Sequence, residues 1–161
     1  MLHTLSTDNS IRKAIDTEGI IIYERIPMET KLKLSHAKLK KALDALKVMV
    51  EKPMQEDRSN VDACIQRFEF SVELFWKYLK RLLEDKGLIV TYPKEILKEA
   101  FQGGLIEDES IWLQMLYDRN QTSHTYDEEL ADKIYKNIVS IYYPLMSRTF
   151  NSLVLPPVEE A

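Results

Sequence analysis

The residues best suited to chemistry lie in the octapeptide RNQTSHTY, residues 119–126. Arg119 carries a permanent positive charge in a planar guanidinium group. His124 has an imidazole ring that gains or loses a proton close to neutral pH. A guanidinium and an imidazole that reach one ligand could hold negative charge and transfer a proton, so the question is whether the chain lets them converge.

The spacing of these two residues argues against a continuous helix through both. Five residues overshoot one helical turn, so Arg119 and His124 would point about 140° apart. Thr125 followed by Glu128 is a capping-box pattern that starts a new helix. We therefore expect a break between Asn120 and Thr125, which leaves backbone groups and both side chains free.

Two interpretations of this turn stay open on the residues alone. In the first, the turn only caps helices: Arg119 pairs with nearby acids, Asn120 caps a helix end and Tyr126 packs its ring. In the second, the side chains form a binding or catalytic site. A nearby face carrying Glu69, Glu73 and Trp76, at spacings of four and three residues, is either a polar surface or a support for Arg119 or His124.

The composition indicates one mostly helical domain. The 161 residues are 45% hydrophobic and 30% charged, with only four glycines and six prolines. Periodic apolar residues predict an all-α fold, an antiparallel four-helix-type bundle with one short extra helix, in which the second helix is central. The expected helices run from Lys31 to Pro53, from about Val61 to Lys86, from Pro93 to Gly103, from Asp108 onward, and from Leu130 to Leu145 with a kink at Pro144.

The first 27 residues do not fit this bundle. SIRKAIDTEG predicts a short helix that ends at Gly19, and IIIYERI predicts a β-strand without a partner strand elsewhere in the chain. Such a strand could pair with a second copy, add to the sheet of another protein, pack on the bundle, or be disordered.

Charge is distributed unevenly along the chain, although the net charge is only −4. Seven lysines lie between residues 31 and 52, whereas Arg119 is the only basic residue among Lys and Arg from Glu99 to Asp132. A polyanion would therefore need a local groove, which two chains together could make. The single Cys64 excludes an internal disulfide, and with no signal-peptide pattern or apolar run of about 20 residues we expect a cytoplasmic protein.

Several segments together resemble a known family. The sequence around residues 118–126 resembles the R-N-x-x-x-H-x-Y form of the R-x4-6-H motif of HEPN domains, specifically those encoded beside a minimal nucleotidyltransferase and formerly described as nucleotidyltransferase substrate-binding proteins. The resemblance covers roughly residues 29–147. Other matching residues are Gln66 to Phe70, Glu73 to Lys77, Pro93, Ala100, Gly104 to Ile106 and Trp112 to Met115.

This resemblance implies a function as well as a fold. It implies a homodimer whose facing motifs form a composite, metal-independent endoribonuclease site, acting as the toxin of a toxin–antitoxin pair. His124 would do the acid/base work, Arg119 would bind phosphate and Asn120 would orient the pair. The partner nucleotidyltransferase antitoxin would neutralise the toxin, and it can add AMP to Tyr126.

The resemblance also defines the expected partners and domains. RNA, either tRNA or mRNA, and the nucleotidyltransferase are the expected partners, with no cofactor, metal, membrane or DNA. The alternative is a non-catalytic subunit that presents substrate to the transferase. We expect a HEPN bundle over 28–150 and a flexible tail over 151–161. Residues 1–27 resemble the closing helix and strand of a nucleotidyltransferase and are hypothesised to be a remnant of, or read-through from, that partner gene.

Overall fold

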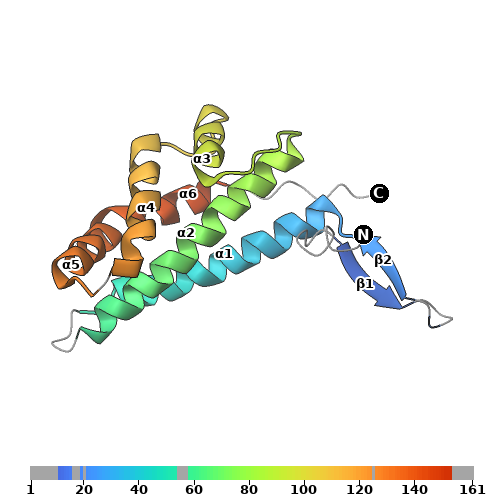
Figure 1. Ribbon diagram of the computed structural model, residues 1–161. Coiled ribbons are helices and arrows are strands. Elements are labelled where there is room, and N and C mark those ends of the chain that lie inside the picture. Colours follow the sequence, from blue (N-terminus) through green and yellow to red (C-terminus); the bar gives the residue numbers. More distant parts are fainter. Residues whose placement is uncertain (1–10, 16–18, 20, 54–57, 125, 154–161) are drawn as a thin grey trace.

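The computed structural model of the chain describes residues 11–15, 19, 21–53, 58–124 and 126–153. Within them a β-hairpin precedes a bundle of helices (Figure 1). The elements are β1 Ile11–Ile15, β2 Ile21–Arg25, α1 Met28–Val50, α2 Ser59–Asp85, α3 Pro93–Gln102, α4 Glu109–Gln121, the 3₁₀ turn η1 Thr122–His124, α5 Glu128–Asn137, the π turn η2 Ile138–Tyr142 and α6 Tyr143–Ser152. The predicted all-α bundle is confirmed, with α3 as the short extra helix.

Helix α2 is the centre of the bundle, as the sequence predicted. It runs antiparallel to α1 along most of its length and also contacts α3, α4 and α5 (Figure 1). Its predicted apolar stripe is fully inside, because each of its six residues is at most 6% exposed: Ile65, Phe68, Val72, Phe75, Leu79 and Leu82. Burial of apolar side chains such as these is the main favourable contribution to the stability of the bundle.

The predicted stop after α2 is a glycine C-cap. Gly87 has a φ of +87°, a left-handed conformation that glycine adopts without steric cost. The Leu88 amide donates to the Leu83 carbonyl at 2.9 Å, and the Gly87 amide donates to the Glu84 carbonyl at 2.9 Å. These two bonds form a Schellman motif, which ends the helix and satisfies its last carbonyls.

The last helix is interrupted where Pro144 was expected to disturb it. Pro144 has no amide hydrogen, and its ring would clash with the Ser140 carbonyl in regular α geometry. The chain widens to a π turn, η2, in which the Tyr143 amide donates to the Ile138 carbonyl.

The helix then continues as α6 to Ser152, so residues 151 and 152 belong to the bundle and not to the expected tail. Residues 154–161 of that tail lie outside the described part.

The prediction of a helix at the N-terminus is wrong. Ile11–Ile15 is a strand that pairs antiparallel with Ile21–Arg25, from Ile11 opposite Arg25 to Ile15 opposite Ile21. Isoleucines at both ends of IRKAI favour an extended chain, and Gly19, with a φ of +82°, lies in the connection. The predicted strand is therefore present, but its partner comes from the same chain. Residues 1–10 lie outside the described part.

No helix in the described ranges is both long enough and apolar enough to cross a membrane.

A buried leucine and an exposed leucine on α1 test the packing. Leu39 is 0% exposed and Leu34 is 52% exposed. Leu39→Ala should lower the free energy of unfolding by about 2–5 kcal/mol, because it leaves a cavity between α1 and α2. Leu34→Ala, the matched control, should change it by about 0.5 kcal/mol or less. Urea denaturation followed by circular dichroism measures both, and equal losses would contradict this packing.

Candidate functional site

Helix α4 ends within the RNQTSHTY segment, as predicted. Arg119 and Asn120 lie in its last turn, after which the chain tightens into the 3₁₀ turn that ends at His124. The Thr122 hydroxyl donates to the Arg119 carbonyl at 2.7 Å, which satisfies a carbonyl at the helix end. Arg119 is therefore held by a helix, and His124 lies beyond it.

The next helix begins two residues later than the predicted capping box. Thr125 lies outside the described residues, and the N-cap of α5 is Asp127. Its carboxylate accepts a hydrogen bond from the Leu130 amide at 3.2 Å. Asp127 is as good an N-cap as threonine and reaches the third amide of the helix, so the prediction of a Thr125–Glu128 box is wrong.

A buried carboxylate holds the end of α4 in place. Asp118 is 5% exposed, and one of its oxygens accepts a hydrogen bond of 2.5 Å from the Tyr142 hydroxyl in η2. The same oxygen accepts from the Asn137 amide at 3.4 Å, and the other accepts from Gln114 at 3.1 Å. Burial and the neighbouring carboxylate raise the pKa of Tyr142 well above its usual range, so the phenol stays a donor.

No role for this network was predicted from the sequence. Asp118 follows Met115 by three residues, and Trp112 precedes Met115 by three, so an acid continues the buried stripe of α4. That placement was a detectable signal of a buried and partnered carboxylate. Tyr142 was expected in the core or at a dimer contact, and it lies in the core.

Arg119 lies beside the residues expected to support it. Its Nη2 is 3.8 Å from Oε2 of Glu73, and Nε1 of Trp76 donates to that same oxygen at 3.2 Å. The other Glu73 oxygen is 3.3 Å from Nζ of Lys77. Thus α2 orients the Arg119 guanidinium through a shared carboxylate. Glu69 makes no ion pair or hydrogen bond with these groups in the described part of the chain.

A pocket of about 470 Å³ opens at this guanidinium. Asn120 lines it, and the Asn120 side chain makes no hydrogen bond among the described residues. The Arg119 Nε is buried and has no acceptor in the described ranges. The Arg119 side chain as a whole is 32% exposed, so the accessible part of its guanidinium can bind an anionic ligand in the pocket. The remaining lining comes from α2, the start of α3 and α4: Glu73, Trp76, Tyr92, Pro93, Lys94 and Leu116.

His124 and Tyr126 form a second, separate pair. His124 is exposed and does not line the Arg119 pocket. The Tyr126 hydroxyl lies 3.4 Å from Nδ1 of His124, and the rings meet edge to face with centroids 5.9 Å apart. Tyr126 itself is 83% exposed. One chain therefore does not bring the imidazole to the guanidinium pocket.

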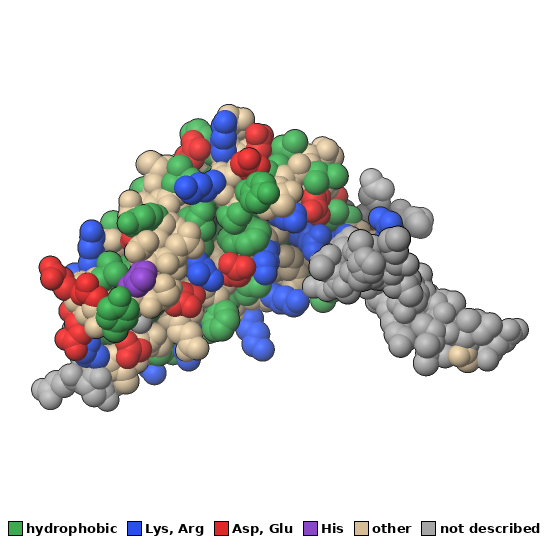
Figure 2. Space-filling model, in the orientation of Figure 1, with side chains coloured by type: hydrophobic (Ala, Val, Ile, Leu, Met, Phe, Trp, Pro, Cys, Tyr) green, Lys and Arg blue, Asp and Glu red, His purple; other side chains and the backbone are tan. Residues whose placement is uncertain are grey.

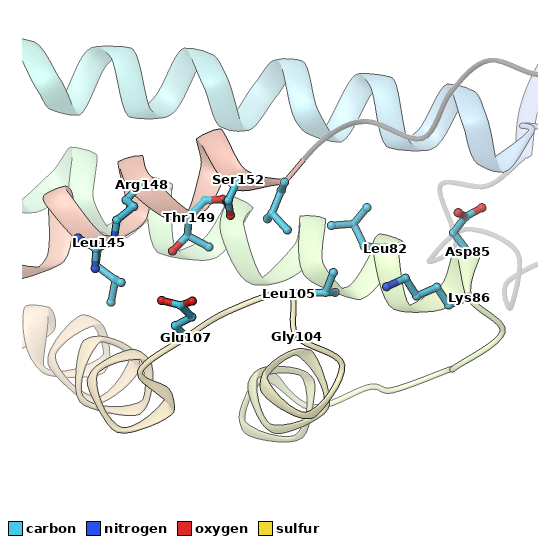
Figure 3. Close-up of a pocket in the computed structure, with 11 residues that line it drawn as sticks. Leu82, Asp85, Lys86, Gly104, Leu105, Glu107, Leu145, Arg148, Thr149 and Ser152 are labelled. Atoms are coloured by element: carbon cyan, nitrogen blue, oxygen red, sulfur yellow. Dashed lines mark hydrogen bonds between the residues drawn. The ribbon is translucent and has the colours of Figure 1, made fainter.

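Another hollow, of about 550 Å³, lies away from the motif (Figure 3). Arg148, Thr149 and Ser152 of α6 border it from one side, and Glu107 and Leu105 of the loop between α3 and α4 border it from the other. None of the predicted site residues lines it. Within the described ranges there is also no group of three or more His, Cys, Asp or Glu side chains that could hold a metal ion.

The Asp118 network yields a test. Tyr142→Phe should lower the free energy of unfolding by about 1.5–3 kcal/mol, since it removes a hydrogen bond to a buried charged group. Tyr143→Phe is the matched control, because the neighbouring phenol makes no hydrogen bond among the described residues. Thermal and urea unfolding measure both variants. A Tyr142→Phe protein as stable as the control would show that the network does not stabilise the bundle.

The chain is similar to a known protein family and to several known proteins. Residues 34–154 match the family described as "Nucleotidyltransferase substrate binding protein like". A Haemophilus influenzae protein named "Probable ribonuclease HepT" is 43% identical over 83 residues, which are 48% of this chain and 57% of that protein. The matched part is thus a little over half of that relative.

Two solved structures share the fold. A Thermus thermophilus protein is 37% identical with a TM-score of 0.64, and the match covers 71% of this chain and 97% of the other. A Haemophilus influenzae protein, described as showing the fold of a substrate binding domain of a nucleotidyltransferase, is 29% identical with a TM-score of 0.56, covering 77% and 97%. With the family match across three quarters of its length, the chain belongs to the nucleotidyltransferase substrate binding protein-like family, as the sequence resemblance predicted.

Proposed function

We propose that this protein is a metal-independent endoribonuclease and the toxin of a toxin–antitoxin pair. The observation that carries the proposal is the state of the two motif side chains. Arg119 lines a pocket with a side chain that is 32% exposed, and His124 is exposed outside that pocket. The alternative is a turn that only caps helices. The ion pair of Arg119 with Glu73 at 3.8 Å fits it, but Asn120 makes no capping bond among the described residues and the Tyr126 side chain, 83% exposed, is not packed.

These residue types suit cleavage of RNA. The substrate carries its own nucleophile, the 2′-hydroxyl, so the protein must move protons and stabilise charge on phosphorus. His124 withdraws the 2′-hydroxyl proton or protonates the leaving oxygen. Arg119 binds the phosphate and stabilises the additional negative charge of the transition state, and Asn120 orients the substrate beside it. The relative named a ribonuclease supports this activity.

A dimer would complete the site. In one chain His124 does not line the pocket of Arg119, so a second copy that brings its motif opposite would supply the missing group. The exposed face of α4 beside the motif is suited to that contact. Leu113 and Tyr117 are 36% and 59% exposed and lie one turn apart, in line with Asn120. Covering them with a second α4 would bury apolar surface and bring the two motifs together.

Tyr126 gives the antitoxin a place to act. In the proposed regulation its phenolic oxygen attacks the α-phosphorus of ATP on the partner nucleotidyltransferase, and pyrophosphate leaves. The new AMP group adds bulk and negative charge at a side chain 3.4 Å from the His124 ring. RNA would then be excluded from the site by steric hindrance and by charge repulsion.

A second candidate is a non-catalytic subunit that presents substrate to a nucleotidyltransferase. The acidic character of residues 99–132, which repels RNA around Arg119, favours it. The structural description of the Haemophilus influenzae relative also favours it. The two candidates differ in whether the protein alone cleaves RNA.

Substitution of the motif separates catalysis from folding. His124→Ala or Arg119→Ala should reduce cleavage of total RNA or of single tRNAs, without added metal, by about 10²-fold or more, the contribution of one acid/base group or of one charge-stabilising group. Ser123→Ala, an exposed neighbour, should cleave like the unsubstituted protein. Circular dichroism should show an intact helical fold in all three. Absence of cleavage by the unmodified protein, verified by intact mass, would favour the substrate-presenting subunit.

Modification of Tyr126 has its own test. Incubation with ATP and the partner nucleotidyltransferase should add the mass of one AMP group and abolish RNA cleavage. Tyr126→Phe should stay unmodified and active, since it lacks the oxygen that attacks ATP. Tyr117→Phe, which alters another exposed tyrosine, should still be modified. Peptide mass spectrometry identifies the site, and AMP on any other residue would contradict the assignment.

A further inference from the structure

A groove between α1 and α2 adjoins the Arg119 pocket. Its volume is about 750 Å³, and its basic lining residues are Lys31, Lys38, Lys77, Lys80 and Arg81. Trp76 lines both this groove and the pocket of Arg119. The two hollows therefore border on the same tryptophan side chain.

The groove has an excess of positive charge. Arg81 is paired with Glu84 at 3.1 Å, and Glu84 is the one acid that lines the groove within the described residues. No carboxylate in the described part of the chain pairs with Lys31, Lys38 or Lys80. Blue side chains gather along α1 and α2 on the face shown in Figure 2. Polyanions are attracted to such a strip, in contrast to the acidic segment around Arg119.

The three lysines that have no ion pair among the described residues form an extended strip of positive charge. Lys31 and Lys38 are seven residues apart on α1, which is about 10 Å along a helix. Lys80 lies across the groove on α2, one turn after Trp76. Charges spread over such a distance match the successive phosphates of a nucleic-acid strand better than one small anion.

Aromatic side chains lie where the groove meets the site. Trp76 is half-buried, with Lys77 Nζ 5.7 Å from its ring centroid. Tyr92, across the Arg119 pocket, is 67% exposed. Proteins that bind unpaired RNA combine a basic path for the backbone with aromatic rings on which bases stack. Paired bases in a duplex do not offer their faces to such rings.

We infer that the groove between α1 and α2 binds single-stranded RNA and leads it to Arg119. The inference rests on the proposed function for its substrate class and adds the path that the substrate takes. Lys31, Lys38 and Lys80 contact successive phosphates, and Trp76 and Tyr92 stack bases next to the cleavage site. The lysines of α1 and α2 thus offset the repulsion of RNA by the acids of residues 99–132.

A binding experiment with matched variants tests the groove. All proteins carry His124→Ala so that the probe, a fluorescently labelled single-stranded oligoribonucleotide of mixed sequence, is not cut. The groove variant is Lys31→Gln/Lys38→Gln/Lys80→Gln. The control is Lys98→Gln/Lys133→Gln/Lys136→Gln, which removes three exposed lysines outside the groove. Fluorescence anisotropy at several salt concentrations gives the affinity and its salt dependence, with circular dichroism to verify folding.

The groove variant should bind single-stranded RNA more weakly at low salt. The slope of log K against log salt should be about 2 smaller in magnitude, because three phosphate contacts on a single strand are lost. The control should keep the slope and affinity of the parent, and the parent should bind the matching duplex more weakly. Parent-like binding by the groove variant would overturn the inference, even if the variant lost affinity for the nucleotidyltransferase.

The same proteins without His124→Ala separate this inference from the proposed function. If the parent cleaves RNA and the groove lysines affect neither binding nor cleavage, the ribonuclease stands and the groove assignment falls. If the parent does not cleave RNA but binding depends on the groove lysines, the groove assignment stands and the ribonuclease falls.

Discussion

The geometry of the candidate site depends on the buried carboxylate of Asp118. A buried charge is tolerated only when donors surround it, and here Tyr142, Asn137 and Gln114 supply them. Because Tyr142 and Asn137 belong to the last helical segments, these bonds fasten the end of α4 to α5 and η2. The next residue along the chain is Arg119, so the network that stabilises the bundle also determines where the guanidinium lies.

Two residues that are close in sequence occupy different environments for this reason. Arg119 remains on a helix that is packed against α2, where Glu73 and Trp76 orient it beside a pocket. His124 is the last residue of the 3₁₀ turn and is exposed to solvent with Tyr126. With Arg119 at the pocket and His124 outside it, the two side chains cannot act on one ligand within a single chain. This arrangement suits the proposed dimer, in which an exposed histidine would be accessible both to a partner chain and to the proposed modifying enzyme.

The charge distribution reconciles an acidic protein with the polyanionic substrate proposed for it. The acids of residues 99–132 surround the motif in sequence, yet α2 brings Lys77 to within 3.3 Å of Glu73, the carboxylate that also pairs with Arg119. Among the described residues, the lysines of the groove that have no ion pair face one lining acid, which is already paired with Arg81. Net charge is therefore a poor guide to the local field here, because that field depends on which helices are neighbours.

The sequence by itself determined the elements that depend on local rules. The period of apolar residues placed the stripe of α2, Gly87 and Pro93 marked helix boundaries, and the motif from Arg119 to Tyr126 indicated the family. It predicted Glu73 and Trp76 as supports for Arg119 only as one of two open interpretations. Tertiary structure decided the rest: the pairing of β1 with β2, the burial of Asp118, and the groove of lysines between α1 and α2. These features join segments that are distant along the chain or choose between local conformations of similar energy, and only packing selects among them.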